Sequence, residues 1–484
     1  DGLVTLAADR GDWVWDMDKI RLRDIAETVV EFMVAKLGRY SGSSRLLVQL
    51  AGCIGHTFKL ETLASVSGRP MRDVAARLWA PVRDGLILPL GAAYDLFGRG
   101  GDPEEGQLLR CKFAHDRIQE ATLSSIPKRK LGEMHLKIGR VTYEHIPESE
   151  RSERIFEYVG HFNLGVELLA PDERRWLGDL NLQAGLRAKD STAYAGAVQY
   201  FERAASLLDD DWDEEYTLLA TLHLERVECL YLAGDTDGAQ AAFEELSPLV
   251  RTPSHIATLS QVMMRILQTE NRVEEGVAEG LRCLGLLGAG PPADPKAVEA
   301  RMGELGAGIG ALIAEKGPQA LLEGPRAEDP EIVAVCGVLQ ETWICALMAS
   351  NLPMVAFTTL SVVHISLEHG ITEVSPAGYV AQAALCALQG DYDGARLFGS
   401  SGLELADAMG GTRLRPMVLN TYGNFTGHMV APLQRNVDRY EESYRTCLRT
   451  GDRWWGAWAA HWARVHRFLK GDVLDDVHGR AVAY

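Results

Sequence analysis

The sequence lacks the short motifs on which most phosphate-transferring and hydrolytic enzymes depend. No Gly-Lys dipeptide occurs in its 484 residues, so it has no Gly-x-x-x-x-Gly-Lys-Ser/Thr loop to cradle nucleotide phosphates. The kinase triplets His-Arg-Asp and Asp-Phe-Gly, the zinc motif His-Glu-x-x-His and the nucleophile turn Gly-x-Ser-x-Gly are also missing. We therefore expect a chain that is not itself an enzyme.

Recognisable sets of metal ligands are also missing. The pairs His364/His369 and His461/His466 are each five residues apart, which puts the two imidazoles of a pair on different faces of a helix. None of the eight cysteines forms a Cys-x-x-Cys pair, and most lie within apolar helical patterns. They are typical of buried, reduced thiols in a cytoplasmic protein. We expect neither a metal nor a cofactor in this chain.

The sequence has fewer positively charged than negatively charged residues. Lysine and arginine number 49 against 67 aspartates and glutamates, a net charge of −18. Such a surface repels phosphate backbones on average, and the basic runs are short, such as Lys128-Arg129-Lys130. We expect no specific nucleic-acid partner.

The chain is longer than one hydrophobic core supports, so we expect more than one domain or a repeat array. It starts at Asp1 and has no signal-like segment, which suggests a trimmed N-terminus or a fragment.

One stretch without charged residues is long enough to cross a bilayer. It covers residues 342–367, but Asn351-Leu352-Pro353 at its centre is typical of a turn between two helices. The pattern therefore favours a buried helical hairpin over a membrane span.

The first 125 residues contain the strand-like patterns. Residues 3–6 and 13–15 flank a turn-prone segment and predict a short hairpin, and residues 86–90 and 108–113 flank the glycine-rich loop 98–103. Between these strand pairs we expect helices near 25–38, 43–54 and 70–84, with a shorter turn at 60–66. Three helices followed by a hairpin predict a winged-helix-like domain over residues 1–125.

After residue 125 the sequence predicts amphipathic helices in pairs, in two segments, 126–290 and 291–484, separated at the Pro/Gly-rich residues 288–295. The clearest unit is 182–208, where alanines recur at helix-contact spacing and Tyr200-Phe201 would fill the groove between neighbouring pairs. Gly234-Asp235 and Gly390-Asp391 begin nearly identical turns, and Gly-Asp returns at 451 and 471. Glycine would end one helix and aspartate would cap the next. We expect an α-superhelix of tetratricopeptide-like pairs.

One short motif has chemical potential. His115-Asp116 falls where the second wing strand passes into a helix, so Asp116 would cap that helix. An imidazole there would donate a hydrogen bond to an anion such as a nucleotide phosphate. The alternative, favoured by the chemistry alone, is that His115 satisfies a local carbonyl.

In their order along the chain, several stretches resemble the middle region of large hybrid signalling proteins. These proteins join a serine/threonine kinase, a signal-transduction ATPase of the AAA/NACHT-like (STAND) type, a helical repeat region and often a sensor histidine kinase. The matching stretches are 13–16, 28–33, 50–55 with Phe58, 113–117, 182–193, 366–379 and 450–452. The similarity is spread over about residues 1–475.

The resemblance implies a winged-helix domain that packs on a nucleotide-binding module outside this chain. The Phe-x-His-Asp position is similar to the Met-His-Asp-type histidine that senses ADP in switch ATPases. This role would fall on His115 with Asp116 beside it, although Ala114 replaces the methionine. ADP or ATP would then belong to the parent protein. The partners would be its own ATPase or kinase domains, or another protein bound by the superhelix.

The main alternative is a DNA-binding transcription regulator with a tetratricopeptide-like sensor. Helix 70–84 would then enter the major groove with Arg69, Arg72, Arg77 and Arg83. Against this reading, Leu78, Trp79 and Val82 give the helix a buried appearance, and two aspartates dilute its charge. A third option, an enzyme of an unseen type, has no support in the sequence.

Overall fold

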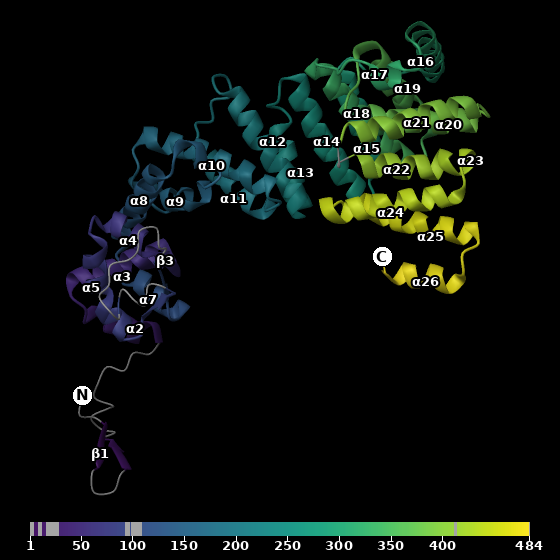
Figure 1. Cartoon of the computed structure of the whole chain (residues 1–484). Helices are drawn as coiled ribbons and strands as arrows, with labels where there is room; N and C mark the ends of the chain where they lie inside the picture. The colour runs from purple at the N-terminus through teal and green to yellow at the C-terminus, as the bar shows by residue number, and fades with distance from the viewer. Residues whose placement is uncertain are drawn as a thin grey trace. The chain divides into compact units, whose positions relative to one another are not determined.

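The computed structural model describes residues 4–7, 12–15, 29–91, 97, 109–410 and 414–483. The fold is mainly α-helical, as the sequence predicted, and the strands in the described part all precede residue 114. Contacts divide the chain into two compact units, Asp1–Asp210 and Asp211–Tyr484. Figure 1 labels the elements of both units. The expected domain limits at 125 and 290 stay predictions.

The first unit begins with strands and short helices. Strands β1 (Val4–Ala7) and β2 (Asp12–Trp15) form the expected hairpin, with Val4 opposite Trp15. The elements that follow are α2 (Val29–Gly38), α3 (Gly42–Ile54), β3 (Thr57–Lys59), α4 (Leu60–Ser67), α5 (Met71–Arg83), β4 (Ile87–Leu90) and β5 (Arg110–Phe113). The glycine-rich loop 98–103 lies outside the described residues.

Besides the β1-β2 hairpin, the first unit has a three-stranded sheet in the order β3-β5-β4, with both strand pairs antiparallel. The sequence predicted β4 and β5 but missed β3, and it gave a turn where α4 forms a helix. Helix α4 exists because Leu60, Leu63 and Val66 enter the core at helical spacing, all fully buried. Gly68 ends it with φ at 67°, in the left-handed region that suits glycine.

Helix α5 presents two different faces. Leu78 is fully buried and Val82 is half-buried, but Trp79 is 46% exposed. The expectation that Trp79 helps to bury this helix is therefore wrong. Trp79 shares its outward face with Arg72, Ala76 and Arg83, because these positions lie four, three and four residues apart in turn.

The rest of the first unit is helical: α7 (Asp116–Ser124), α8 (Lys128–His145), η1 (Glu148–Glu150), η2 (Ile155–Glu157), α9 (Val159–Leu164), η3 (Val166–Leu168), α10 (Pro171–Asp190) and α11 (Tyr194–Ala205). Helices α10 and α11 form the predicted pair. Phe201 is fully buried and its ring lies so close to Gly185 that a Cβ there would collide with it. Phe201 is thus the aromatic plug that the sequence predicted, whereas Tyr200 is only half-buried.

The second unit is a stack of helices that pack mostly as antiparallel neighbours (Figure 1). Its elements are α12 (Tyr216–Ala233), α13 (Thr236–Leu246), α14 (Pro253–Thr269), α15 (Val273–Leu286), α16 (Pro295–Lys316), α17 (Ala320–Glu323), α18 (Pro330–Met348), α19 (Leu352–His369), α20 (Ser375–Leu388), α21 (Tyr392–Ala408), α22 (Arg415–Tyr422), the π-helical turn η4 (Gly423–Gly427), α23 (His428–Val430), α24 (Leu433–Thr450), α25 (Arg453–Lys470) and α26 (Leu474–Ala483).

The repeated Gly-Asp turns form the predicted joints. Gly234 ends α12 with φ at 89°, and Asp235 caps α13 by accepting a hydrogen bond from the Gly238 amide at 2.9 Å. Gly390 has φ at 80°, and Asp391 accepts from the Gly394 amide at the same distance. Asp452 likewise caps α25. The fourth joint differs, because Asp472 pairs with Lys470 and Arg467 instead.

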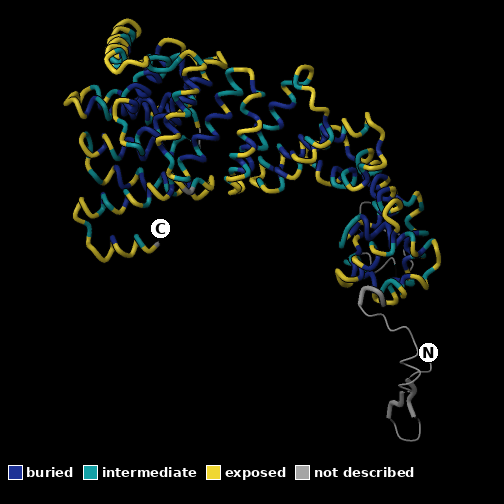
Figure 2. Tube along the Cα trace, turned by 180° about the vertical axis from the view of Figure 1, so that it is seen from behind, coloured by how far each residue is buried: buried dark blue, intermediate teal, exposed yellow. Residues whose placement is uncertain are grey.

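The uncharged run 342–367 is split between α18 and α19, which pack against each other. Asn351 lies between them and caps α19 through the Met354 amide. This is the helical hairpin that the sequence predicted. Within the described residues, α18 is long and apolar enough to cross a membrane. However, 61% of its most apolar stretch is buried against the rest of the fold, as in the core helix of a folded domain. Figure 2 shows buried residues gathered among these helices.

The segment around residues 288–295 is a turn, with Asp294 capping α16. Helices before and after it share one hydrophobic core, to which Met264, Cys283 and Leu339 all contribute. All eight cysteines are buried. Burial raises the pKa of the Cys53 and Cys111 thiols to about 12, which keeps them protonated at neutral pH.

Candidate functional site

The candidate site lies where the central strand β5 passes into α7. Phe113 is fully buried, and its amide donates to the His56 carbonyl at 2.9 Å. One residue later the Ala114 amide donates to the Leu86 carbonyl at 3.0 Å, so both neighbouring segments of the sheet fix this end of the strand. Residues 114–117 are exposed. The sheet therefore presents the start of α7 to solvent on a rigid base.

His115 caps α7. Its backbone is extended, and its Nδ1 accepts a hydrogen bond from the Arg117 amide at 3.2 Å. The cap was expected from Asp116, and that expectation is wrong, because Asp116 is already the first residue of the helix. An Nδ1 that accepts a hydrogen bond carries no proton. The neutral ring must then hold its proton on Nε2, which remains available as a donor.

The Asp116 carboxylate is turned toward a second histidine. Its Oδ1 lies 2.9 Å from the Nδ1 of His56, in the connection between α3 and β3. The Asp116 side chain is 88% exposed, and the alignment is not that of an N–H hydrogen bond. An exposed contact of this kind contributes little to stability. It does bring His56, which the sequence did not single out, beside Asp116.

The arrangement suits an anion more than a catalytic step. The start of a helix carries partial positive charge, and Lys112 and Arg117 flank His115 in the sequence. Arg117 also pairs with Glu120 at 3.0 Å, which holds its guanidinium on the exposed side of α7. Across the described ranges, histidine, cysteine and acidic residues nowhere gather in threes as a metal would require.

A second pair of histidines lies elsewhere in the first unit. The Nδ1 atoms of His135 in α8 and His161 in α9 are 2.9 Å apart, and the rings stack. Burial, and secondarily the neighbouring His135, lowers the pKa of His161 to about 4. Burial also lowers the pKa of His135. The sequence gave no signal for this pair, because 26 residues separate its members.

No protein-family model matches the chain. It is 23% identical over 560 aligned positions to hybrid signal transduction histidine kinase G of Dictyostelium discoideum. The match covers all of this chain but only 16% of that protein. Among solved structures, the chain is similar to a signal transduction ATPase with numerous domains that has a tetratricopeptide repeat sensor, from Pyrococcus horikoshii. The identity is 12%, with 96% of this chain and 66% of that one covered, and the TM-score is 0.33, which is too low to establish a shared fold.

Proposed function

We propose that this chain is a non-catalytic regulatory segment of a larger cytoplasmic signalling protein that contains a STAND-type ATPase and a kinase. One observation carries the proposal: the similarity to a hybrid signal transduction histidine kinase runs through the whole chain, although the chain matches a small part of that protein. A segment of this kind would receive a signal and pass it to catalytic domains elsewhere.

The first unit would be the relay. The order α3, β3, α4, α5, β4, β5, with its three-stranded antiparallel sheet, supports a winged-helix assignment for this region. In the resting state its His115 would donate from Nε2 to the phosphate of ADP held by the ATPase module. The cap at Nδ1 supports this role because it fixes the proton on the nitrogen that faces away from α7. Asp116 would position His56 at the same surface.

The stacked helices of the second unit would be the sensor. Large apolar side chains are exposed on its last two helices and the turn between them: Trp454, Trp458, Phe468, Leu469, Val473 and Leu474. Exposed large apolar side chains are common on surfaces that bind proteins, and we propose that these helices take part in such binding. The partner would be another protein, or the kinase and ATPase domains of the same protein.

One observation supports the DNA-binding alternative. Residues 29–91 hold eight lysines and arginines against four acidic residues, and residues 109–140 hold eight against three, so this region is basic within an acidic chain. On α5, however, Asp73 holds both Arg69 and Arg77 at 2.9 Å. The hydrogen bond from Arg77, and then that from Arg69, lowers the pKa of Asp73 and keeps it ionised. A carboxylate in the first turn of α5 that already pairs with two arginines opposes a phosphate backbone, so the regulatory proposal stands first.

The test is the rate of ADP release from the protein that joins this chain to its ATPase module. Loss of one hydrogen bond to a charged phosphate is worth about 1.5–3 kcal/mol, so His115→Ala is expected to release a fluorescent ADP roughly 10–100-fold faster. His145→Ala is the matched control, because His145 is exposed in the same unit and bonds only its own helix at Val141. Equal release rates for wild type and His115→Ala would refute the sensor role.

A further inference from the structure

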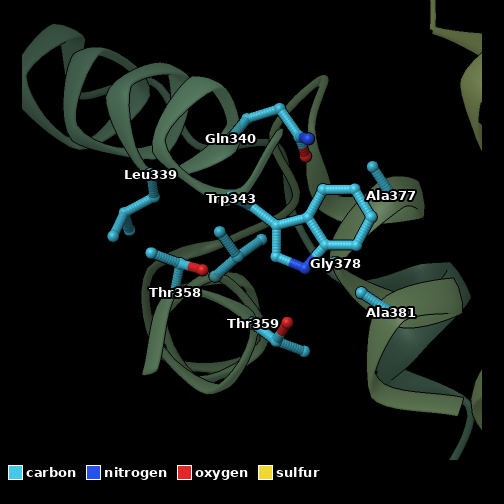
Figure 3. A pocket seen from close by; sticks show the side chains of 9 residues that line it. Leu339, Gln340, Trp343, Thr358, Thr359, Ala377, Gly378 and Ala381 are labelled. Carbon is cyan, nitrogen blue, oxygen red and sulfur yellow. The ribbon is translucent and has the colours of Figure 1, made fainter. Parts of the chain in front are cut away.

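Helices α18, α19 and α20 line a small cavity in the second unit (Figure 3). Its volume is about 10 Å³. The lining residues are Leu339, Gln340, Trp343, Thr358, Thr359, Val362, Ala377, Gly378 and Ala381. The small residues of α20 leave the space into which the indole of Trp343 and the threonines of α19 project (Figure 3).

One wall of the cavity holds a hydrogen-bond donor without an acceptor. Trp343 is only 6% exposed, and its Nε1 is buried with no partner among the described residues. Figure 3 shows the indole nitrogen on the side of Thr359, Gly378 and Ala381. Buried polar groups in folded proteins nearly always have a protein or water partner, because an unmade bond forfeits the hydration lost on burial.

The facing wall offers acceptors. The Thr359 hydroxyl donates its proton to the Val355 carbonyl at 2.7 Å, and the Thr358 hydroxyl donates to the Met354 carbonyl at 2.9 Å. Each oxygen keeps lone pairs for a further bond. Gln340, on the same helix as Trp343, donates its amide nitrogen to Met417 Sδ at 3.5 Å, and its amide lies beside the six-membered ring of the indole, away from Nε1 (Figure 3). The cavity thus places one donor, from α18, opposite two hydroxyl acceptors, from α19, around the volume of one small molecule.

We propose that this cavity is a binding site for a single internal water molecule. The water accepts from Trp343 Nε1 and donates to the hydroxyl oxygens of Thr359 and Thr358. About 10–15 Å³ and two to four polar partners are what one buried water requires. Every lining side chain is uncharged, so nothing here recruits an ion. The water ties α18 to α19 in place of a direct side-chain bond.

The first test detects the water at the indole proton. In protein deuterated at carbon and labelled with ¹⁵N on its tryptophan rings, the Trp343 Hε1 signal is assigned by its loss in Trp343→Phe. A cross-peak of the sign expected for a long-lived water is predicted at this proton. The absence of a water cross-peak at an assigned Trp343 Hε1 would overturn the proposal.

The second test asks whether Trp343 and Thr359 act through one water. Trp343→Phe and Thr359→Val each remove one of its partners, so the double variant should lower the urea midpoint by less than the sum of the single shifts. Thr342→Val is the matched control. Thr342 is buried and makes the same backbone bond, to Val338 at 2.7 Å, but does not line the cavity. Additive shifts for the Trp343/Thr359 pair would also overturn the proposal.

Discussion

His115 uses one ring nitrogen to cap its own helix, and the proposed function assigns the other nitrogen to a ligand. Its Nδ1 is committed to the Arg117 amide, while the rest of the ring is exposed. The capping bond is long at 3.2 Å and solvent reaches it, so it adds little to stability. Nδ1 therefore has a minor structural role, whereas the proposed sensing role falls on Nε2.

Replacing His115 tests this separation. We expect His115→Ala to lower the free energy of unfolding by about 1 kcal/mol or less, since only an exposed helix cap is lost. His115→Ser keeps a capping oxygen and should recover that loss in a urea titration. Because serine supplies no donor at the Nε2 position, it should not restore slow ADP release. A His115→Ala variant that unfolds would indicate a core role.

His135 and His161 make the first unit sensitive to acid. The pKa of His161 is about 4 in the folded chain, against about 6.5 in an unfolded one. As the pH falls from about 6.5 toward 4, His161 therefore binds a proton in the unfolded chain but not in the folded chain. The contribution of His161 to the free energy of unfolding is therefore constant above pH 6.5. Below that pH it falls, by up to roughly 3 kcal/mol.

Urea titrations at pH 7.5 and 5 measure this effect. We expect His161→Phe, which cannot take up the proton, to lose less stability between the two pH values than wild type. His145→Ala, at an exposed histidine, should keep the full pH dependence. If His161→Phe and wild type decline equally, the paired histidines are not the source.

At the scale of elements, the Gly-Asp joints set where each helix stops. Gly234 and Gly390 both have a left-handed backbone, and a Cβ at either would meet no atom within 4 Å. Any penalty for a side chain at these positions must therefore come from the backbone conformation and not from crowding. This makes the two glycines an unusually clean pair for measuring conformational strain.

We expect Gly234→Val and Gly390→Val each to lower the free energy of unfolding by about 1–3 kcal/mol. A β-branched residue is strained at positive φ, and the two effects should be similar because the turns are alike. Gly196→Val in α11 serves as a comparison for open space without positive φ. Unchanged midpoints for both joint variants would show that the turns tolerate side chains.

Local patterns explain what the sequence revealed and what it did not. Joint glycines, capping aspartates and the Phe201 plug are short-range features, so their spacing alone predicted them. Strand β3 is only three residues long and exists because Phe58 pairs opposite Cys111 of β5, 53 positions later. The contacts His56–Asp116 and His135–His161 likewise join separate elements, and no local pattern encodes them. The sequence singled out His115 and Asp116 but not His56.

At the scale of the whole molecule, charge is unevenly distributed. The net charge of −18 includes a basic region around α2–α8, but within it Asp73 pairs with Arg69 and Arg77 at the start of α5. We therefore expect weak, sequence-independent binding to duplex DNA at physiological salt, with a Kd on the order of 10⁻⁴–10⁻⁶ M. Fluorescence anisotropy with several unrelated duplexes would measure it. Nanomolar, sequence-specific binding would instead promote the transcription-regulator alternative.

The isolated chain should neither bind nor hydrolyse ATP appreciably. Triphosphate binding draws on a loop of backbone amides and a lysine, and no such loop occurs in the sequence. His115 and the start of α7 supply at most one anion contact, which is too little for affinity below the millimolar range. Isothermal titration of the chain with Mg-ATP should show no saturable heat at about 100 μM protein. Joining the ATPase module should create micromolar binding, whereas stoichiometric micromolar binding by the chain alone would contradict the division of labour proposed for it.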